Sequence, residues 1–161
     1  MQNIMQSQTP VSRALSEKGV THRQFHHSGP ITSLQQAAQE RGQRPEQVVR
    51  SIVFRLSQDE FVMVLVSGPE QVSWSALRSH LGRSRLTMAS QEEVLAKTGY
   101  EIGAVSPFGL PDPMKILVDQ GILEEEEISI GSGTRGVTII LNSRDFIYAL
   151  EDYEFGRFKS D

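Results

Sequence analysis

Two strongly apolar segments near the middle of the chain predict the centre of a β-sheet. Residues 48–56 place Val48, Ile52 and Phe54 at alternate positions, and residues 61–66 are apolar throughout. Alternation is typical of a strand with one buried face, and a short unbroken apolar run is typical of a strand buried on both faces. A polar turn at residues 58–60 separates the two segments. We therefore expect an antiparallel hairpin at the centre of a sheet.

Further apolar segments predict more strands at residues 20–27, 83–88, 114–118, 128–130 and 137–141. The glycine-rich residues 131–136 fit a hairpin turn between the last two. Hydroxyl residues that can cap helices, and glycines that can end them, divide the remainder into short helices. The caps are Thr9, Ser33, Ser73 and Ser90, and a last helix is expected over residues 143–150. This irregular mixture predicts an α+β fold with helices around a mixed sheet.

The stretch Gly99–Gly109 shows neither the periodicity of apolar residues typical of a helix nor the alternation typical of a strand. It combines three glycines, Pro107 and two aromatic residues within a short segment. Glycine allows backbone conformations and close approaches that other residues resist, and proline stiffens the chain. Such a loop is either a tight connection or a site where backbone N–H groups bind an oxyanion or a phosphate. Residue types alone leave both interpretations open and favour the connection.

Composition is that of a soluble globular chain forming a single domain over residues 1–161, with a core at about residues 8–150. The chain has 161 residues, of which 38% are hydrophobic and 22% charged, and the segment after Glu151 is polar enough to be loosely held. It has no cysteine, which excludes disulfides and thiolate chemistry. Residues 1–10 are polar without an apolar signal core, and no segment is long enough to span a membrane. A cytoplasmic location is therefore expected.

Charge is unevenly distributed along the chain. Residues 1–100 hold 11 lysines and arginines against 8 aspartates and glutamates, a net charge of +3, whereas residues 101–161 hold 5 against 12, a net charge of −7. The positive part could contact a polyanion such as a nucleic acid, although scattered solvated arginines explain the same numbers. Those arginines are Arg41, Arg44, Arg50, Arg55, Arg78, Arg83 and Arg85.

Familiar catalytic patterns do not occur. His26 and His27 are adjacent and would point to opposite faces of a strand, so we expect surface or half-buried histidines and no metal site. No GxSxG nucleophile motif is present. The four glutamates at residues 124–127 are expected to be a solvated turn or edge.

Several segments taken together resemble the YbaK and prolyl-tRNA-synthetase-associated editing domains. They are residues 45–54, the strand 61–66, the loop 98–109 with its Gly-x-x-x-Pro motif at residues 103–107, the strand ending at Val118-Asp119, and residues 131–141 with Asp145. The resemblance covers roughly residues 8–150. It implies a curved, barrel-like mixed sheet surrounded by helices, in a stand-alone member.

The resemblance also implies an activity. Members of the family hydrolyse the ester that joins a wrong, small amino acid to a tRNA, chiefly proline tRNA, without metal or cofactor. The implied partners are tRNA and, through it, prolyl-tRNA synthetase. The implied oxyanion donor is the N–H of Gly103, with Arg50 as the second catalytic residue. The substrate pocket would comprise Phe25, Ser51, Ser106, Pro107, Phe108, Gly109, Gly136 and Thr138.

Two positions depart from the family pattern. Arg50 stands where members generally have lysine, and Thr138 where well-studied members have aspartate or histidine. Arginine keeps the charge but is longer and does not exchange a proton. Besides a trans-editing hydrolase, the sequence therefore leaves two alternatives. One is a non-catalytic module that binds a tRNA acceptor end or a synthetase, and the other is a small-molecule-binding domain without an RNA partner.

Overall fold

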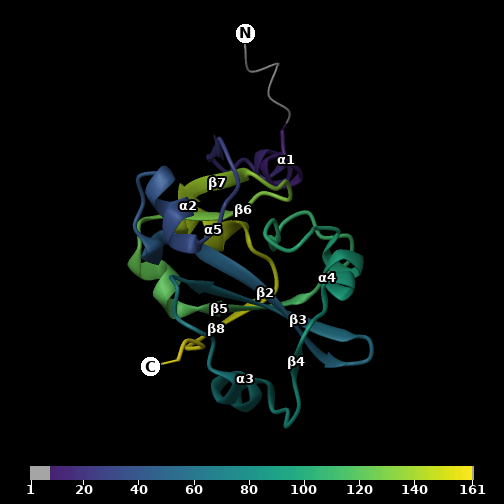
Figure 1. Ribbon diagram of the computed structural model, residues 1–161. Coiled ribbons are helices and arrows are strands. Elements are labelled where there is room, and N and C mark those ends of the chain that lie inside the picture. Colours follow the sequence, from purple (N-terminus) through teal and green to yellow (C-terminus); the bar gives the residue numbers. More distant parts are fainter. Residues whose placement is uncertain (1–7, 161) are drawn as a thin grey trace.

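The computed structural model describes residues 8–160 and contains five α-helices, two short 3₁₀-helices and eight strands (Figure 1). Residues 1–7, part of the segment in which we looked for an export signal, lie outside the described residues. The helices are α1 (Pro10–Glu17), α2 (Leu34–Glu40), η2 (Pro45–Gln47), α3 (Trp74–Leu81), α4 (Gln91–Thr98), η3 (Gln120–Glu124) and α5 (Ser143–Ala149). The strands are β1 (Arg23–His26), β2 (Val49–Ser57), β3 (Glu60–Ser67), β4 (Thr87–Met88), β5 (Lys115–Asp119), β6 (Glu127–Gly131), β7 (Val137–Asn142) and β8 (Tyr153–Gly156).

The strands form two sheets. One has five strands in the order β4-β2-β3-β5-β8, and the other has three in the order β1-β7-β6. The five-stranded sheet is mixed, because β2 pairs with β3 antiparallel while β3 pairs with β5, and β5 with β8, in parallel. A parallel bridge between Val48 and Ser129 connects the sheets. The predicted α+β fold with a mixed sheet is confirmed, as two joined sheets and not a closed barrel.

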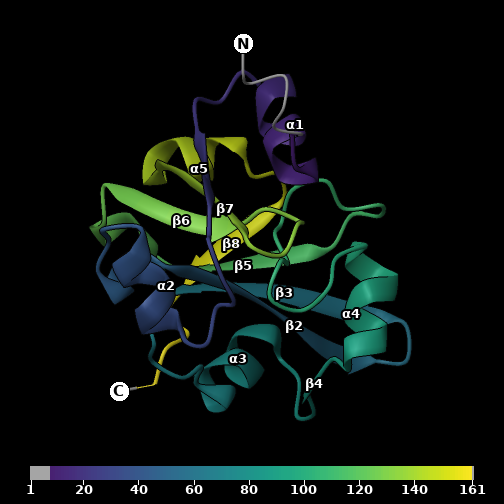
Figure 2. The same ribbon diagram turned by 45° about the horizontal axis from the view of Figure 1, so that its top comes forward.

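Strand β3 is the centre of the molecule. Its alternate residues Phe61, Met63 and Leu65 belong to the larger core, which fills the space between the two sheets. The intervening residues Val62, Val64 and Val66 belong to a second core on the opposite face, with Leu77 of α3. Figure 2 shows α3 and the three-stranded sheet on opposite sides of the five-stranded sheet. The strand is thus buried on both faces, which explains why residues 61–66 are apolar throughout.

Local signals set the helix boundaries as predicted. The side chains of Thr9, Ser33, Ser73 and Ser90 each accept a hydrogen bond from a backbone N–H in the first turn of the following helix. Helix α4 ends at Gly99, whose φ of 80° is left-handed and therefore favours glycine. The glycine-rich loop accordingly begins at a helix end that the sequence already specified.

The segment after Glu151 differs from expectation. It is not loosely held, because Tyr153–Gly156 form β8 at the edge of the five-stranded sheet. Phe158 is buried in the second core, and its N–H donates to the carboxylate of Asp119 at 2.7 Å. The four acidic residues run from the end of η3 to the start of β6, an edge strand, and none of them is buried, as expected for a solvated turn or edge. Among the described residues, no helix has the length and apolar character needed to cross a membrane.

Candidate functional site

A cavity of about 240 Å³ lies where the two sheets meet, beneath α2. It brings together the starts of β2 and β7, the end of β6, one face of α2 and the turn at Gly103. Of the site residues predicted from the sequence, it collects Arg50, Ser51, Gly103, Gly136 and Thr138. These residues come from distant parts of the chain, so the cavity is a product of the tertiary fold. Other cavities on the surface are larger, but none gathers these residues.

Gly103 occupies the third position of a four-residue turn that the N–H of Ala104 closes by donating to the carbonyl of Glu101 at 3.0 Å. Its φ of 98° lies in the region that disfavours residues with a side chain. The residue is exposed, and in residues 8–160 its N–H has no hydrogen-bond partner. The turn thus places beside the cavity a backbone N–H group that makes no hydrogen bond within the described chain.

The rest of the loop is held in place by its own hydrogen bonds and by the β6–β7 hairpin. Tyr100 Oη donates to the carbonyl of Phe108 at 2.6 Å, and burial raises the pKa of this tyrosine. The N–H of Gly133 donates to the carbonyl of Ala104 at 2.9 Å. At Gly131 an added Cβ would collide with the backbone of the loop. The loop therefore rests directly on β6, and only a glycine at residue 131 permits that approach.

The other predicted pocket residues do not line this cavity. Ser106 is fully buried and its hydroxyl accepts from the N–H of Phe108 at 3.4 Å. Phe108 packs edge-on against Phe146 in the core. Pro107 and Gly109 line a different cavity, beside the end of α5. Phe25 pairs with Thr138 across β1 and β7, on the same face of the sheet, and contacts the ring of His27 edge-on, but it does not itself line the cavity.

Arg50 and Ser51 carry the buried side-chain N and O atoms that, among the described residues, lack a hydrogen-bond partner. These atoms are Arg50 Nε and Ser51 Oγ, neighbours on the strand that enters the cavity. The guanidinium of Arg50 donates instead to the backbone carbonyl of Glu70. Burial lowers the pKa of Arg50, and the nearby Glu70 opposes that shift. Unsatisfied polar groups are rare in folded proteins and are expected where a ligand or water completes them.

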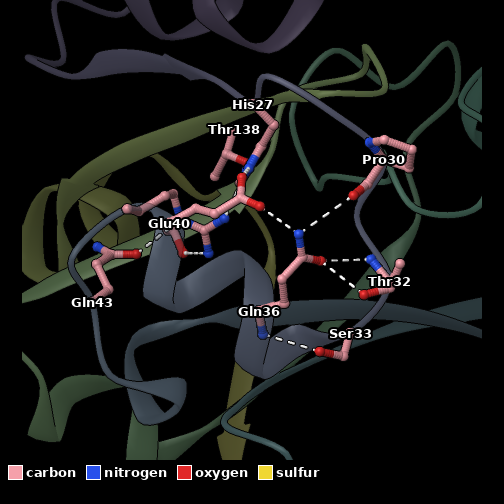
Figure 3. Close-up of polar contacts among 10 residues, drawn as sticks. His27, Pro30, Thr32, Ser33, Gln36, Glu40, Gln43 and Thr138 are labelled. Carbon is pink, nitrogen blue, oxygen red and sulfur yellow. Dashed lines mark hydrogen bonds and ion pairs between the residues drawn. The ribbon is translucent and has the colours of Figure 1, made fainter.

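A polar cluster that the sequence did not reveal lies beside the cavity and contributes Arg41 and Thr138 to its wall (Figure 3). Arg41, at the end of α2, lines the cavity beside Thr138. Its Nη1 donates to His27 Nε2 at 3.0 Å, and His27 Nδ1 lies 2.7 Å from Glu40 Oε1. His27 as a whole residue is half-buried, as expected, and its side chain is 0% exposed. The available signal was the spacing of Leu34, Ala37 and Arg41, which puts an arginine on the same helix face as apolar residues.

The cavity is electropositive. Arg41 and Arg50 line it, and no acidic side chain does. Burial lowers the pKa of Arg41, partly offset by Glu40, yet arginine stays charged in proteins. Arg44, Arg55 and Arg83 instead form ion pairs elsewhere, with Glu125, Glu93 and Glu60. Within residues 8–160, no group of three His, Cys, Asp or Glu side chains could hold a metal ion.

Comparison with known proteins identifies related sequences. A family model described as an aminoacyl-tRNA editing domain matches residues 28–148. A proline–tRNA ligase of Kosmotoga olearia is 34% identical over 106 residues, which are 66% of this chain and 18% of the ligase. A proline–tRNA ligase of Halalkalibacterium halodurans is 24% identical over 153 residues, which are 95% of this chain and 25% of that ligase. The chain therefore corresponds to about a fifth to a quarter of these relatives.

The fold also matches a solved structure over nearly its whole length. A crystal structure described as that of a proposed trans-editing enzyme for prolyl tRNA synthetase superposes with a TM-score of 0.85. The two chains share 25% sequence identity, and the match covers 94% of this chain and 96% of the other. Unlike the ligases, this structure is a chain of similar extent.

Proposed function

Because the chain belongs to the aminoacyl-tRNA editing domain family, we propose that it is a trans-editing deacylase that hydrolyses the ester of a mischarged tRNA. The observation that carries the proposal is the cavity in which the exposed turn of Gly103 meets the positively charged wall of Arg41 and Arg50. The likeness to part of proline–tRNA ligases supports proline tRNA carrying a small wrong amino acid as the substrate. Work in translation would place the protein in the cytoplasm.

Ester hydrolysis needs a group that stabilises negative charge on the carbonyl oxygen. As water attacks, the carbonyl becomes a tetrahedral oxyanion; the bond to the ribose oxygen then breaks, and that oxygen leaves with a proton. We assign the N–H of Gly103 to the oxyanion, because it is held in a rigid turn beside the cavity without a partner in the described chain. One well-placed donor of this kind is worth about 3–4 kcal/mol. A hydroxyl of the terminal ribose would relay the proton, so no side-chain base is required.

The electropositive wall fits the rest of the substrate. The acceptor end of a tRNA carries one negative charge per phosphate, and contacts of arginine with phosphates position a nucleic acid without reading its sequence. Arg50 lies near the start of β2, where this strand lines the cavity, and its Nε is buried without a hydrogen-bond partner in the described chain. We propose that tRNA binding reorients its guanidinium from the Glu70 carbonyl to the substrate.

The deciding experiment follows ester loss from a panel of mischarged proline tRNAs, with correctly charged prolyl-tRNA as the control. Faster loss of at least one mischarged ester than in the absence of protein would support the proposal. If no ester is hydrolysed while tRNA still binds in a salt-sensitive manner, the protein is a binding module and not an enzyme. If tRNA does not bind even at low salt, the remaining alternative is a small-molecule site.

The binding module is the second candidate because the guanidinium of Arg50 is engaged with the backbone of Glu70. The variant Arg50→Lys tests whether the deacylase or the non-catalytic binding module is the better description. If the site works as in relatives with lysine, this variant keeps or raises the hydrolysis rate at unchanged fold stability. A complete loss of hydrolysis would mean that the site depends on the guanidinium itself.

A further inference from the structure

The guanidinium of Arg41 is fixed in place by contacts with four side chains. Its Nε donates to Gln43 Oε1 at 3.1 Å, and its Nη2 donates to Ser129 Oγ at 2.9 Å. Its Nη1 donates to His27 Nε2 at 3.0 Å and lies 3.5 Å from Thr138 Oγ1. A guanidinium has five N–H groups. These contacts use four, so in residues 8–160 one N–H of Nη2 has no partner and belongs to a side chain that lines the cavity.

The position of the proton on His27 follows from its neighbours. The guanidinium of Arg41 can only donate, so Nε2 of His27 must accept. The proton of the ring then sits on Nδ1, where it faces the carboxylate of Glu40 at 2.7 Å. Glu40, His27 and Arg41 thus form a row of hydrogen bonds that runs from a carboxylate through an imidazole to a guanidinium. Such rows fix the orientation of the last group, as they do for other functional side chains.

The row of side chains Glu40, His27 and Arg41 is itself held by hydrogen bonds to α2 and to the loop that precedes it. The side-chain amide of Gln36 donates to Glu40 and to the carbonyl of Pro30, while its oxygen accepts from the N–H of Thr32 at 2.7 Å. Figure 3 shows Gln36 and Glu40, one helical turn apart, directed toward Pro30 and His27 respectively. The guanidinium of Arg41 is therefore held from behind by a network that itself faces away from the cavity.

We propose that Arg41 selects the side chain of the bound aminoacyl group by donating its free N–H to an oxygen acceptor on that side chain. This inference rests on the proposed deacylase function. Arg41 is suited to the role because Arg50 directs its guanidinium to Glu70, whereas Arg41 contacts Ser129 and Thr138, which also line the cavity. An alkyl side chain at this place would exclude water from the remaining N–H of a half-buried cation without accepting from it, which is costly. Hydroxyl and carboxylate side chains share the required chemistry.

The test compares isosteric ligands that differ only in the acceptor. Adenosine analogues carrying serine or 2-aminobutyrate through a 3′-amide cannot be hydrolysed, so calorimetry measures their binding whether or not the protein is an enzyme. We expect the seryl analogue to bind about 10- to 100-fold more tightly than the 2-aminobutyryl analogue, the range expected for one hydrogen bond to a charged group. An aspartyl analogue tests the carboxylate: tighter binding than serine identifies an anionic side chain, and weaker binding a hydroxyl.

Arg41→Met should reduce the preference for serine to less than about threefold, because it removes the donor and keeps an unbranched side chain. Arg41→Lys, which keeps the positive charge but lacks the planar, paired N–H donors of a guanidinium, should retain an intermediate preference for serine. The matched control is Arg44→Met, which changes an exposed arginine outside the cavity and should leave the preference unchanged. Thermal unfolding of each variant verifies that it is folded.

Equal binding of the seryl and 2-aminobutyryl analogues to the unaltered protein would overturn the assignment of Arg41, even if mischarged tRNA is hydrolysed. So would a serine preference that survives in Arg41→Met. Conversely, a serine preference that disappears in Arg41→Met would support the assignment even if no ester is hydrolysed. The two proposals can therefore fail independently.

Discussion

Gly131→Ala should uncouple hydrolysis from folding more cleanly than any change at Gly103 itself. Because Gly131 does not have a positive φ, alanine there introduces no backbone strain. The added Cβ would, however, lie 3.0 Å from the carbonyl carbon of Ala104 and still closer to the carbonyl oxygen of Val105. Ordinary contacts of a Cβ begin at 3.4 Å. The loop that carries Gly103 must therefore move away from β6, by about 1 Å.

A displacement of this size has different consequences for stability and for catalysis. Overpacking of a tight contact costs about 1–3 kcal/mol of unfolding free energy, which a domain of ordinary stability survives. Misplacing a catalytic group by about 1 Å can lower the rate by about 100-fold. We thus expect kcat/KM for a mischarged tRNA to fall by about two orders of magnitude in a variant that remains folded at 25 °C.

The assay is ester hydrolysis at substrate concentrations well below KM, together with urea unfolding of the same preparations. Gly29→Ala is the control, since an added Cβ there meets no atom within 4 Å and Gly29 has no positive φ. Chemical shifts of the Ala104 and Gly133 amides report whether the loop has moved, because the two residues share a hydrogen bond. Shifted amides with unchanged hydrolysis would refute the role given to the turn at Gly103.

Two further predictions concern stability. Tyr100→Phe leaves the buried carbonyl of Phe108 without its donor and should lower the free energy of unfolding in urea by about 1–3 kcal/mol. Because burial raises the pKa of Tyr100 above 10.0, the unfolded chain loses this proton first; stability should decline as the pH rises above about 10, and less steeply in Tyr100→Phe. Phe158→Ala should cost about 3–5 kcal/mol, since that ring is 1% exposed, whereas Tyr148→Ala, at a side chain 82% exposed, should change stability by less than about 0.5 kcal/mol. A small effect at Phe158 would mean that the C-terminal segment is not part of the folded core.

Features that depend on neighbouring residues were readable from the sequence. The hairpin of β2 and β3 follows from two apolar segments and a short polar turn, and the starts of α1 to α4 follow from hydroxyl residues that each satisfy a free N–H. The glycine-rich loop was visible for the same reason, because the conformation of Gly103 is a property of its own backbone. Resemblance to a family then indicated which of these features belong to a site.

Only the tertiary structure decided which side chains meet. His27 and Thr138 are 111 residues apart in the chain, and Arg41 contacts both because the fold brings the end of α2 beside the start of β7. The same holds for β8, which is too short to show a clear spacing and owes its place to pairing with β5. Local patterns encode the elements and the backbone of the loop, whereas the cationic wall opposite that loop arises from contacts between distant segments, which no spacing within one segment can specify.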